Sequence, residues 1–396
     1  MASAPTFVET QSRPGTFWGL LAAGGLFLLA AFAAFLHFEH SGHVVTGMDN
    51  QIVWGLPHVF AIFMIVAASG VLNVASIGSV FGQAAYKPRA PLSGLLCLAL
   101  LAGGLMVLML DLGRPERIVV AATHYNFKSV FAWNVILYSG MVAIVAVYLW
   151  TMFERRFNAW SKPAGIAALI WRFVLTTGTG SIFGFLVARQ AYQSALLAPL
   201  FIVLSFGWGL AVFVVVQAAM YAWNGRTLAP DVERRLARLL AVFVAASVYL
   251  VAVYHLTNAY YARQQSFEAF LLLGRGGGGL YALLFWGGYV LLGSVLPFVL
   301  LLWTRQGLHR AALLVVLGAF AFLYVFIIGG QAFPLEIFPG HTVTSPFGDG
   351  QAAHYVPSWP EALLGFGGLG AAFVLTVVGV RVLDFMPADD LAAANH

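Results

Sequence analysis

Long apolar runs separated by short polar segments repeat along the whole chain. About 20 helical residues cross the hydrocarbon core of a bilayer, so each run predicts one membrane-spanning helix. Ten such helices are predicted, at residues 17–36, 55–82, 91–110, 129–152, 165–188, 195–223, 236–257, 279–304, 309–330 and 359–382. The pattern therefore predicts an all-α polytopic membrane protein, with residues 1–396 forming a single integral membrane domain.

Composition supports this class and narrows the redox chemistry. Of the 396 residues, 61% are hydrophobic and only 9% are charged, whereas a soluble domain carries about 25% charged residues. The single cysteine, Cys97, lies inside an apolar run. This excludes disulfides, c-type haem attachment and cysteine-ligated iron–sulfur clusters within the chain. A redox centre would have to be held by histidine, diffuse in the membrane, or belong to a partner.

The distribution of basic residues predicts the orientation. Fourteen lie on the side that holds the N-terminus and six on the other side, which by the positive-inside rule makes both termini cytoplasmic. The net charge of +5 follows from this bias and does not indicate nucleic-acid binding. The fourteen are Arg13, Lys87, Arg89, Arg155, Arg156, Lys162, Arg172, Arg226, Arg234, Arg235, Arg238, Arg305, Arg310 and Arg381; the six are Arg114, Arg117, Lys128, Arg189, Arg263 and Arg275.

Residues 111–117 carry four charges directly after the uncharged run at 91–110. Exposing the Asp111 carboxylate to lipid would be costly, so it needs a partner, water or a function. It could pair with Arg114 or Arg117, or cap a backbone turn. The predicted orientation places this segment on the outer face.

His58 and His255 are predicted at the same depth as Asp111, because each lies at the outer end of its span. Oxidation of a quinol releases two electrons and two protons, and its site needs an apolar slot and groups that titrate near neutrality. We therefore predict that His58 and Asp111 are catalytic, with Arg114, Tyr254 and His255 as further quinone contacts. Each has a structural alternative: His58 could bond a carbonyl, Arg114 could anchor the interface, and Tyr254 and His255 could belong to an aromatic belt.

Other polar groups leave alternatives open. His37, His40 and His43 could form a metal site or a wet, pH-sensitive loop end, and no metal ligand is assigned. Polar residues near Asn73 and Thr176 predict close helix packing or a hydrated proton path. No carboxylate or lysine lies near the middle of a span, so no complete proton wire is evident. The outer segment 331–358, which contains four prolines and His341, predicts a lid or a docking surface.

The sequence Asp111-Leu-Gly-Arg-Pro115 resembles a motif of the NrfD/polysulfide reductase (PsrC-like) family of membrane subunits. Within that family, residues 45–48, 50–58, 73–76 and 333–340 are most similar to the DsrP-type subunits of sulfite-reduction-associated DsrMKJOP complexes. The resemblance implies two four-helix bundles, at 55–188 and 195–330, with flanking helices and a long periplasmic loop at 331–358. His58 matches a second-helix histidine that contacts quinol in related proteins, and Asp111 matches the acidic position at the end of the third helix.

The resemblance also implies a non-covalently bound quinone, menaquinone or ubiquinone, and no iron–sulfur cluster in the chain itself. Its implied partners are a periplasmic ferredoxin-like iron–sulfur subunit, a c-type cytochrome, a haem b membrane subunit and a cytoplasmic iron–sulfur subunit. The predicted location is a bacterial cytoplasmic (inner) membrane.

The predicted function is that of a quinone- or quinol-interacting subunit of a respiratory or sulfur-metabolism complex, which exchanges electrons with a periplasmic iron–sulfur partner. Two alternatives remain. A haem b cytochrome would use His58 and His255 as axial ligands; it is disfavoured because only these two span histidines are well placed. A transporter or ion-translocating module would need binding groups or broken helices at mid-bilayer.

Overall fold

The computed structural model describes residues 7–8, 14–304, 307–335, 351–383 and 385–387. Within these ranges ten helical segments are long and apolar enough to cross a membrane, which confirms the predicted polytopic all-α class. The α-helices are α1 (Pro14–Ser41), α2 (Leu56–Ser79), α3 (Ala90–Leu110), α4 (Ile118–Thr123), α5 (Val130–Phe153), α6 (Ser161–Gly184), α7 (Leu197–Trp223), α8 (Pro230–Tyr260), α9 (Gln265–Leu273), α10 (Gly279–Leu283), α11 (Leu296–Trp303), α12 (Leu308–Leu323), α13 (Gly330–Ala332) and α14 (Trp359–Val382).

Shorter elements complete the described chain. The π-helices η7 (Leu284–Val295) and η8 (Tyr324–Gly329) extend α10 and α12. The 3-10 helices are η1 (His43–Val45), η2 (Lys87–Arg89), η3 (Pro115–Arg117), η4 (Arg155–Trp160), η5 (Ala262–Gln264) and η6 (Arg275–Gly277). The strands β1 (Phe7–Val8) and β2 (Met386–Pro387) pair antiparallel.

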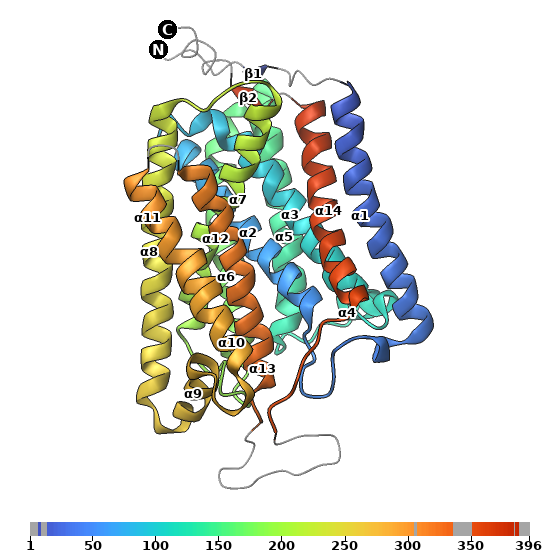
Figure 1. Cartoon of the computed structure of the whole chain (residues 1–396). Helices are drawn as coiled ribbons and strands as arrows, with labels where there is room; N and C mark the ends of the chain where they lie inside the picture. The colour runs from blue at the N-terminus through green and yellow to red at the C-terminus, as the bar shows by residue number, and fades with distance from the viewer. Residues whose placement is uncertain (1–6, 9–13, 305–306, 336–350, 384, 388–396) are drawn as a thin grey trace.

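Helix α2 occupies the centre of the molecule (Figure 1) and contacts α3, α6, α7, α12 and α14. It is predominantly apolar and buried on all sides, as expected for a helix enclosed by other helices. Helices α2, α3, α5 and α6 contact one another in a ring, which we term the first bundle. Helices α7, α8 and α12 form a second ring with η7 and α11, termed the second bundle. Helices α1 and α14 pair beside α3 (Figure 1).

Close helix approaches join these parts through glycine. A Cβ added at Gly70 of α2 would lie 1.6 Å from the carbonyl oxygen of Ser205 on α7. Gly293 of η7 and Gly318 of α12 make a comparable backbone contact within the second bundle. Small residues let membrane helices approach at backbone distance, where dispersion contacts are densest. The two bundles are therefore in direct contact along the α2–α7 seam.

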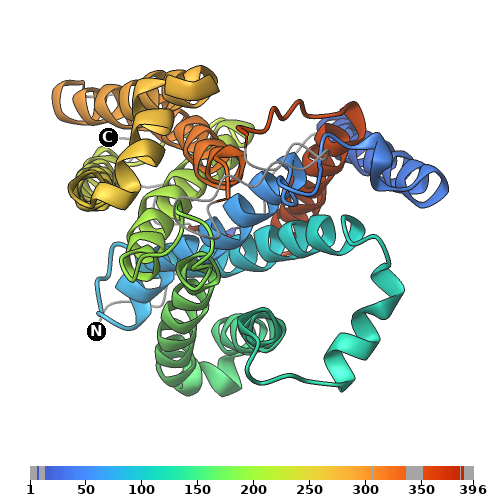
Figure 2. The same cartoon turned by 90° about the horizontal axis from the view of Figure 1, so that it is seen from below.

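The described ends of the chain share one face of the molecule. Helix α1 begins and α14 ends there, beside the β1–β2 pair (Figure 1). Helix α2 begins at the opposite face, and α3 and α8 end there. Figure 2 shows this opposite face, with α9 and the connecting segments in front of the helices. Of the predicted loop at 331–358, residues 336–350, including His341, lie outside the described residues.

The prediction that Arg172 lies with the basic residues at the end of a span, on the predicted cytoplasmic face, is wrong. Arg172 lies about halfway along α6 and is buried. Its Nη1 donates a 2.6 Å hydrogen bond to Oδ1 of Asn73 on α2, and its guanidinium lies over the rings of Phe173 and Phe206. Lipid cannot hydrate the charge of the guanidinium. The Asn73 amide and the two aromatic rings replace part of the hydration that this charge loses on burial.

Candidate functional site

His58 and Asp111 meet at the face where α2 begins and α3 ends. His58 lies in the first turn of α2, and Asp111 is the residue that follows α3. His58 Nδ1 is 3.1 Å from Asp111 Oδ2. The side chain of Asp111 is 2% exposed, and that of His58 is 21% exposed. The two residue types predicted to handle protons are thus adjacent, one buried and one with partial access to its surroundings.

The pair is close but is not aligned as a hydrogen bond. Within the described part of the chain, neither carboxylate oxygen of Asp111 accepts a hydrogen bond, and His58 Nδ1 has no hydrogen-bond partner. A buried polar atom without a hydrogen-bond partner costs free energy, and a ligand that supplies the missing partner removes this cost. The pair therefore retains hydrogen-bonding capacity for a ligand.

The backbone at Asp111 is held from the segment that follows α1. His43 Nε2 lies 3.1 Å from the carbonyl oxygen of Asp111, and the His43 ring stacks on Phe38. Among the described residues, no ion pair joins Asp111 to Arg114 or Arg117. The side chain of Arg114 is exposed. His43, and neither of the two basic neighbours, thus holds this turn in the described part of the chain.

Trp54 forms one wall beside His58. The two rings stack with centroids 6.0 Å apart and an interplanar angle of 26°. The indole also meets Phe131 of α5 and Phe183 of α6 edge to face. Phe131 is half exposed, so the apolar surface beside His58 continues outward onto α5.

The first turn of α2 is anchored by Tyr355, which is itself bonded to Glu361 in the first turn of α14. The Leu56 N–H donates to the Tyr355 hydroxyl oxygen at 2.7 Å, and the Tyr355 O–H donates to Glu361 Oε1 at 2.6 Å. Glu361 Oε2 accepts from the N–H groups of Gly47 and Ser358, both at 2.8 Å, and completes a capping box on α14. Burial, reinforced by Glu361, raises the pKa of Tyr355, so the phenol remains a donor.

A second acid–histidine cluster lies in the second bundle. His255 Nδ1 is 2.8 Å from Glu268 Oε2, and Asn258 Nδ2 donates to Glu268 Oε1 at 2.9 Å. The hydroxyl of Tyr254 donates to the carbonyl of Ala191. Here both carboxylate oxygens have partners from the protein itself.

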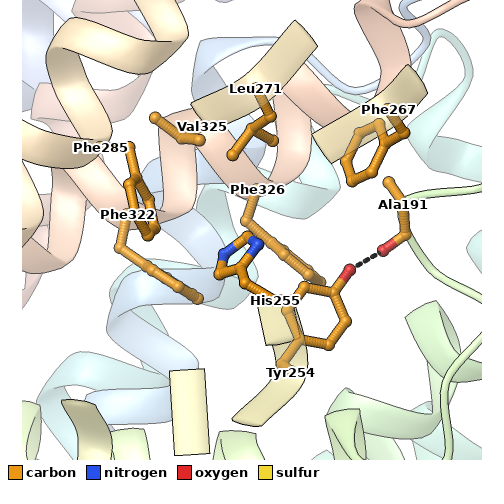
Figure 3. Close-up of a pocket in the computed structure, with 9 residues that line it drawn as sticks. All are labelled: Ala191, Tyr254, His255, Phe267, Leu271, Phe285, Phe322, Val325 and Phe326. Atoms are coloured by element: carbon orange, nitrogen blue, oxygen red, sulfur yellow. Dashed lines mark hydrogen bonds between the residues drawn. The ribbon is translucent and has the colours of Figure 1, made fainter. Parts of the chain in front are cut away.

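His255 borders a cavity of about 10 Å³, room for about one water molecule. Figure 3 shows its imidazole among apolar side chains that include Phe285, Phe322 and Phe326. A quinone ring is much larger than this cavity. Tyr254 and His255 line this cavity, whereas His58 does not border it, so the structure gathers the predicted contacts at two places.

An aromatic series connects the two places. Phe183 meets Trp54 with ring centroids 5.5 Å apart, and it meets Phe326 at 5.0 Å. Phe326 in turn lines the cavity at His255. These rings stand between the two histidines, each of which faces its own carboxylate and not the other histidine.

Residues 44–335 match the model of the family described as polysulphide reductase, NrfD. The chain belongs to the NrfD family. The matched region contains both bundles and both acid–histidine clusters, whereas α1 and α14 lie outside it. The chain is a multi-pass integral membrane protein of this family.

Two of the following relatives are named as subunits of an oxidoreductase or a reductase. The chain is 28% identical over 351 residues to the Hdr-like menaquinol oxidoreductase integral membrane subunit of Archaeoglobus fulgidus, with 87% of each chain covered. It is 24% identical to the polysulfide reductase C subunit of Wolinella succinogenes, covering 72% of this chain and 96% of that one. It is also 24% identical to protein NrfD of Escherichia coli, covering 68% and 91%.

Three residues at these two clusters were not singled out as contacts in the sequence. Trp54 lies four residues before His58. Within one helix this spacing predicts a contact, but α2 begins only after Trp54. His43 was considered only with its neighbours as a metal site. The pairing of Glu268 with His255 had one available signal, since Glu268 follows His255 by 13 residues, shortly after the end of the same predicted span.

Proposed function

We propose that this chain is the quinone-interacting membrane subunit of a redox complex. The observation that carries the proposal is the close, hydrogen-bond-deficient pair of His58 and Asp111. The name of the Archaeoglobus fulgidus relative supports menaquinol as the substrate. Cys97 is buried and is the chain's single cysteine, so the chain holds no cysteine-ligated cluster of its own, and we place the electron acceptor on a partner subunit.

The two side chains divide the proton chemistry. Asp111, with no donor on either carboxylate oxygen, accepts a proton from a quinol hydroxyl. His58 lies 3.1 Å away and is partly exposed, so it passes protons between Asp111 and the surrounding water. Two protons leave as two electrons move to the partner.

The surface beside the pair suits a lipid-soluble substrate. Phe131 of α5 and the side chains of Ile118 and Val119 on α4 are exposed at this end of the first bundle. One cavity of the described structure is lined by Leu96 and another by His255, and His58 borders neither of them. We therefore place the quinol headgroup against Trp54 and His58 and the isoprenoid tail along α4 and α5.

Charge distribution gives the proposed setting. With the basic excess on the cytoplasmic side, both termini are cytoplasmic and the His58–Asp111 pair faces the outer side of a bacterial cytoplasmic membrane. A ferredoxin-like iron–sulfur subunit on that face would receive the electrons, as in DsrMKJOP-type complexes.

The test is the binding of a quinol analogue to the purified complex. We expect His58→Ala and Asp111→Asn each to weaken binding at least tenfold, because a hydrogen-bonding partner of the headgroup is lost. His124→Ala and Glu116→Gln, at exposed positions of the same face, serve as controls. Unchanged binding in both site variants would refute the proposed site.

A further inference from the structure

Gln331, at the end of the second bundle, holds the backbone of the segment that leads into His58. It lies in α13, directly after η8, and is 1% exposed. Its Oε1 accepts from the N–H groups of Val53 and Trp54, both at 3.0 Å. Its Nε2 donates to the carbonyl oxygens of Trp54 and Ile327, both at 2.9 Å. All four hydrogen-bonding positions of the amide are thus used.

The π-helical turn supplies the geometry for this contact. Ile327 lies in η8, and its carbonyl oxygen accepts from both Gln331 Nε2 and the Tyr192 hydroxyl, at 2.9 and 2.8 Å. π-Helical turns are rare and occur often at functional sites. Gln331 is consequently fixed to its own helix with one N–H and to Trp54 with the other.

Two more side chains reinforce the same connection. Arg189 donates to the carbonyl oxygens of Gln331 and Gln51, at 2.9 and 2.6 Å. The amide of Gln51 lies 3.0 Å from the carbonyl oxygen of Ala332. Burial lowers the pKa of Arg189, and Tyr192 and Asp49 oppose this shift. The side chains of Gln331, Arg189 and Gln51 thus bind backbone groups on both sides of this contact. The segment before α2 therefore has little freedom to move.

Trp54 connects this anchored segment to the predicted site. Gln331 binds both the N–H and the C=O of Trp54, while the indole stacks on His58 and meets Phe183 with its edge. Gln331 itself does not touch His58 or Asp111 in the hydrogen bonds and ion pairs of the described residues. We propose that Gln331 is a positioning residue for the His58–Asp111 site, and that it acts through Trp54.

This inference rests on the proposed quinol chemistry at His58. It implies that a residue at the end of the second bundle influences the reaction in the first bundle. Movement of η8 or α13 would displace Trp54 and thereby change how the imidazole faces the substrate. The pair in the first bundle would then be controlled from a helix that contributes no reacting group.

The experiment combines Gln331→Met with Trp54→Phe in the assembled complex. Methionine keeps the approximate length and removes every hydrogen bond of the amide. We expect Gln331→Met to lower quinol oxidation at least tenfold, and to add less than a twofold loss in the Trp54→Phe background, because coupled residues are not additive. Gln217→Met, at a buried glutamine of α7, is the matched control. An equal loss in both backgrounds would overturn the proposal.

A conservative variant gives a readout that loss of folding cannot imitate. Gln331→Glu keeps an acceptor for the two N–H groups but, when ionised, donates to neither carbonyl oxygen. Protonation restores one donor, so its activity relative to wild type should rise as the pH falls. A constant ratio across pH would contradict the assignment.

A quinone-free measurement separates this proposal from the function on which it rests. The ring signal of His58 in histidine-labelled protein, identified by its loss in His58→Ala, should shift in Gln331→Met because Trp54 leaves its stacked position. A shift together with unaltered quinol oxidation in His58→Ala would refute the proposed function and support the positioning. An unshifted signal would refute the positioning alone.

Discussion

Two acid–histidine pairs lie toward the same face of the protein, and they differ in how their carboxylates are satisfied. In the first bundle, Asp111 lies 3.1 Å from His58 without a hydrogen bond to either of its oxygens. In the second bundle, Glu268 is bonded by His255 at 2.8 Å and by Asn258 at 2.9 Å. The same residue types thus form one pair with free hydrogen-bonding capacity and one that is complete.

The difference follows from what surrounds each acid. Asp111 lies just beyond the end of α3, where the neighbouring residues of α4 and α5 leave apolar side chains exposed. Glu268 lies on α9, which folds back onto α8 and is buried against it. A carboxylate at a helix end can remain without hydrogen-bond partners from the protein, whereas one between two packed helices acts as a cross-link.

The largest expected effect is on turnover, and it should separate the pairs. Asp111→Asn removes the proposed proton acceptor while conserving shape, so quinol oxidation should fall by about 10² or more. Glu268→Gln should change turnover less than about threefold. The measurement is steady-state oxidation of a soluble menaquinol analogue by the purified complex. Equal losses in both variants would show that the second pair also takes part in the reaction.

Stability should show the reverse order. Glu268→Leu removes the acceptor of two buried hydrogen bonds and leaves His255 and Asn258 without it, at a cost of about 1–3 kcal/mol. Asp111→Asn breaks no hydrogen bond of the carboxylate and should leave the melting temperature nearly unchanged. Thermal unfolding of both variants in the same detergent tests this. A larger destabilisation by Asp111→Asn would invert the comparison.

The smallest effect concerns how the first pair is held. Tyr355→Phe removes one donor to Glu361 and the acceptor for the Leu56 N–H, which should cost about 1 kcal/mol. The loss should appear as faster hydrogen exchange at Leu56, in the turn that carries His58. Tyr324→Phe, at a neighbouring ring, is the control. Unchanged exchange at Leu56 would mean that the start of α2 is held by other contacts.

The end of the helices at which each residue lies could be predicted from the sequence, but its lateral position could not. Apolar run lengths set the helix ends, and so His58, Asp111 and His255 were correctly placed toward one face. Which helices are neighbours in the plane depends on packing such as the Gly70 contact with α7, and no periodicity indicates it. That is why Tyr254 and His255 were grouped with a site from which the structure separates them.

The misplacement of Arg172 has a different origin. Counting basic residues near span ends assumes that each one reaches water, and Arg172 was assigned to the nearer end. The structure instead provides it with Asn73 and two aromatic rings inside the protein. Likewise, Trp54 precedes the first turn of α2, and only the folded loop shows that its indole turns back onto His58.

The buried guanidinium of Arg172 links the free energy of placing α6 in the bilayer to its packing against α2. An arginine at the centre of an isolated helix raises the free energy of insertion by roughly 2.5–3.5 kcal/mol. Asn73, which relieves this cost, is made 99 residues earlier. Packing of α6 against α2 recovers part of this cost, which α6 alone in lipid would carry in full.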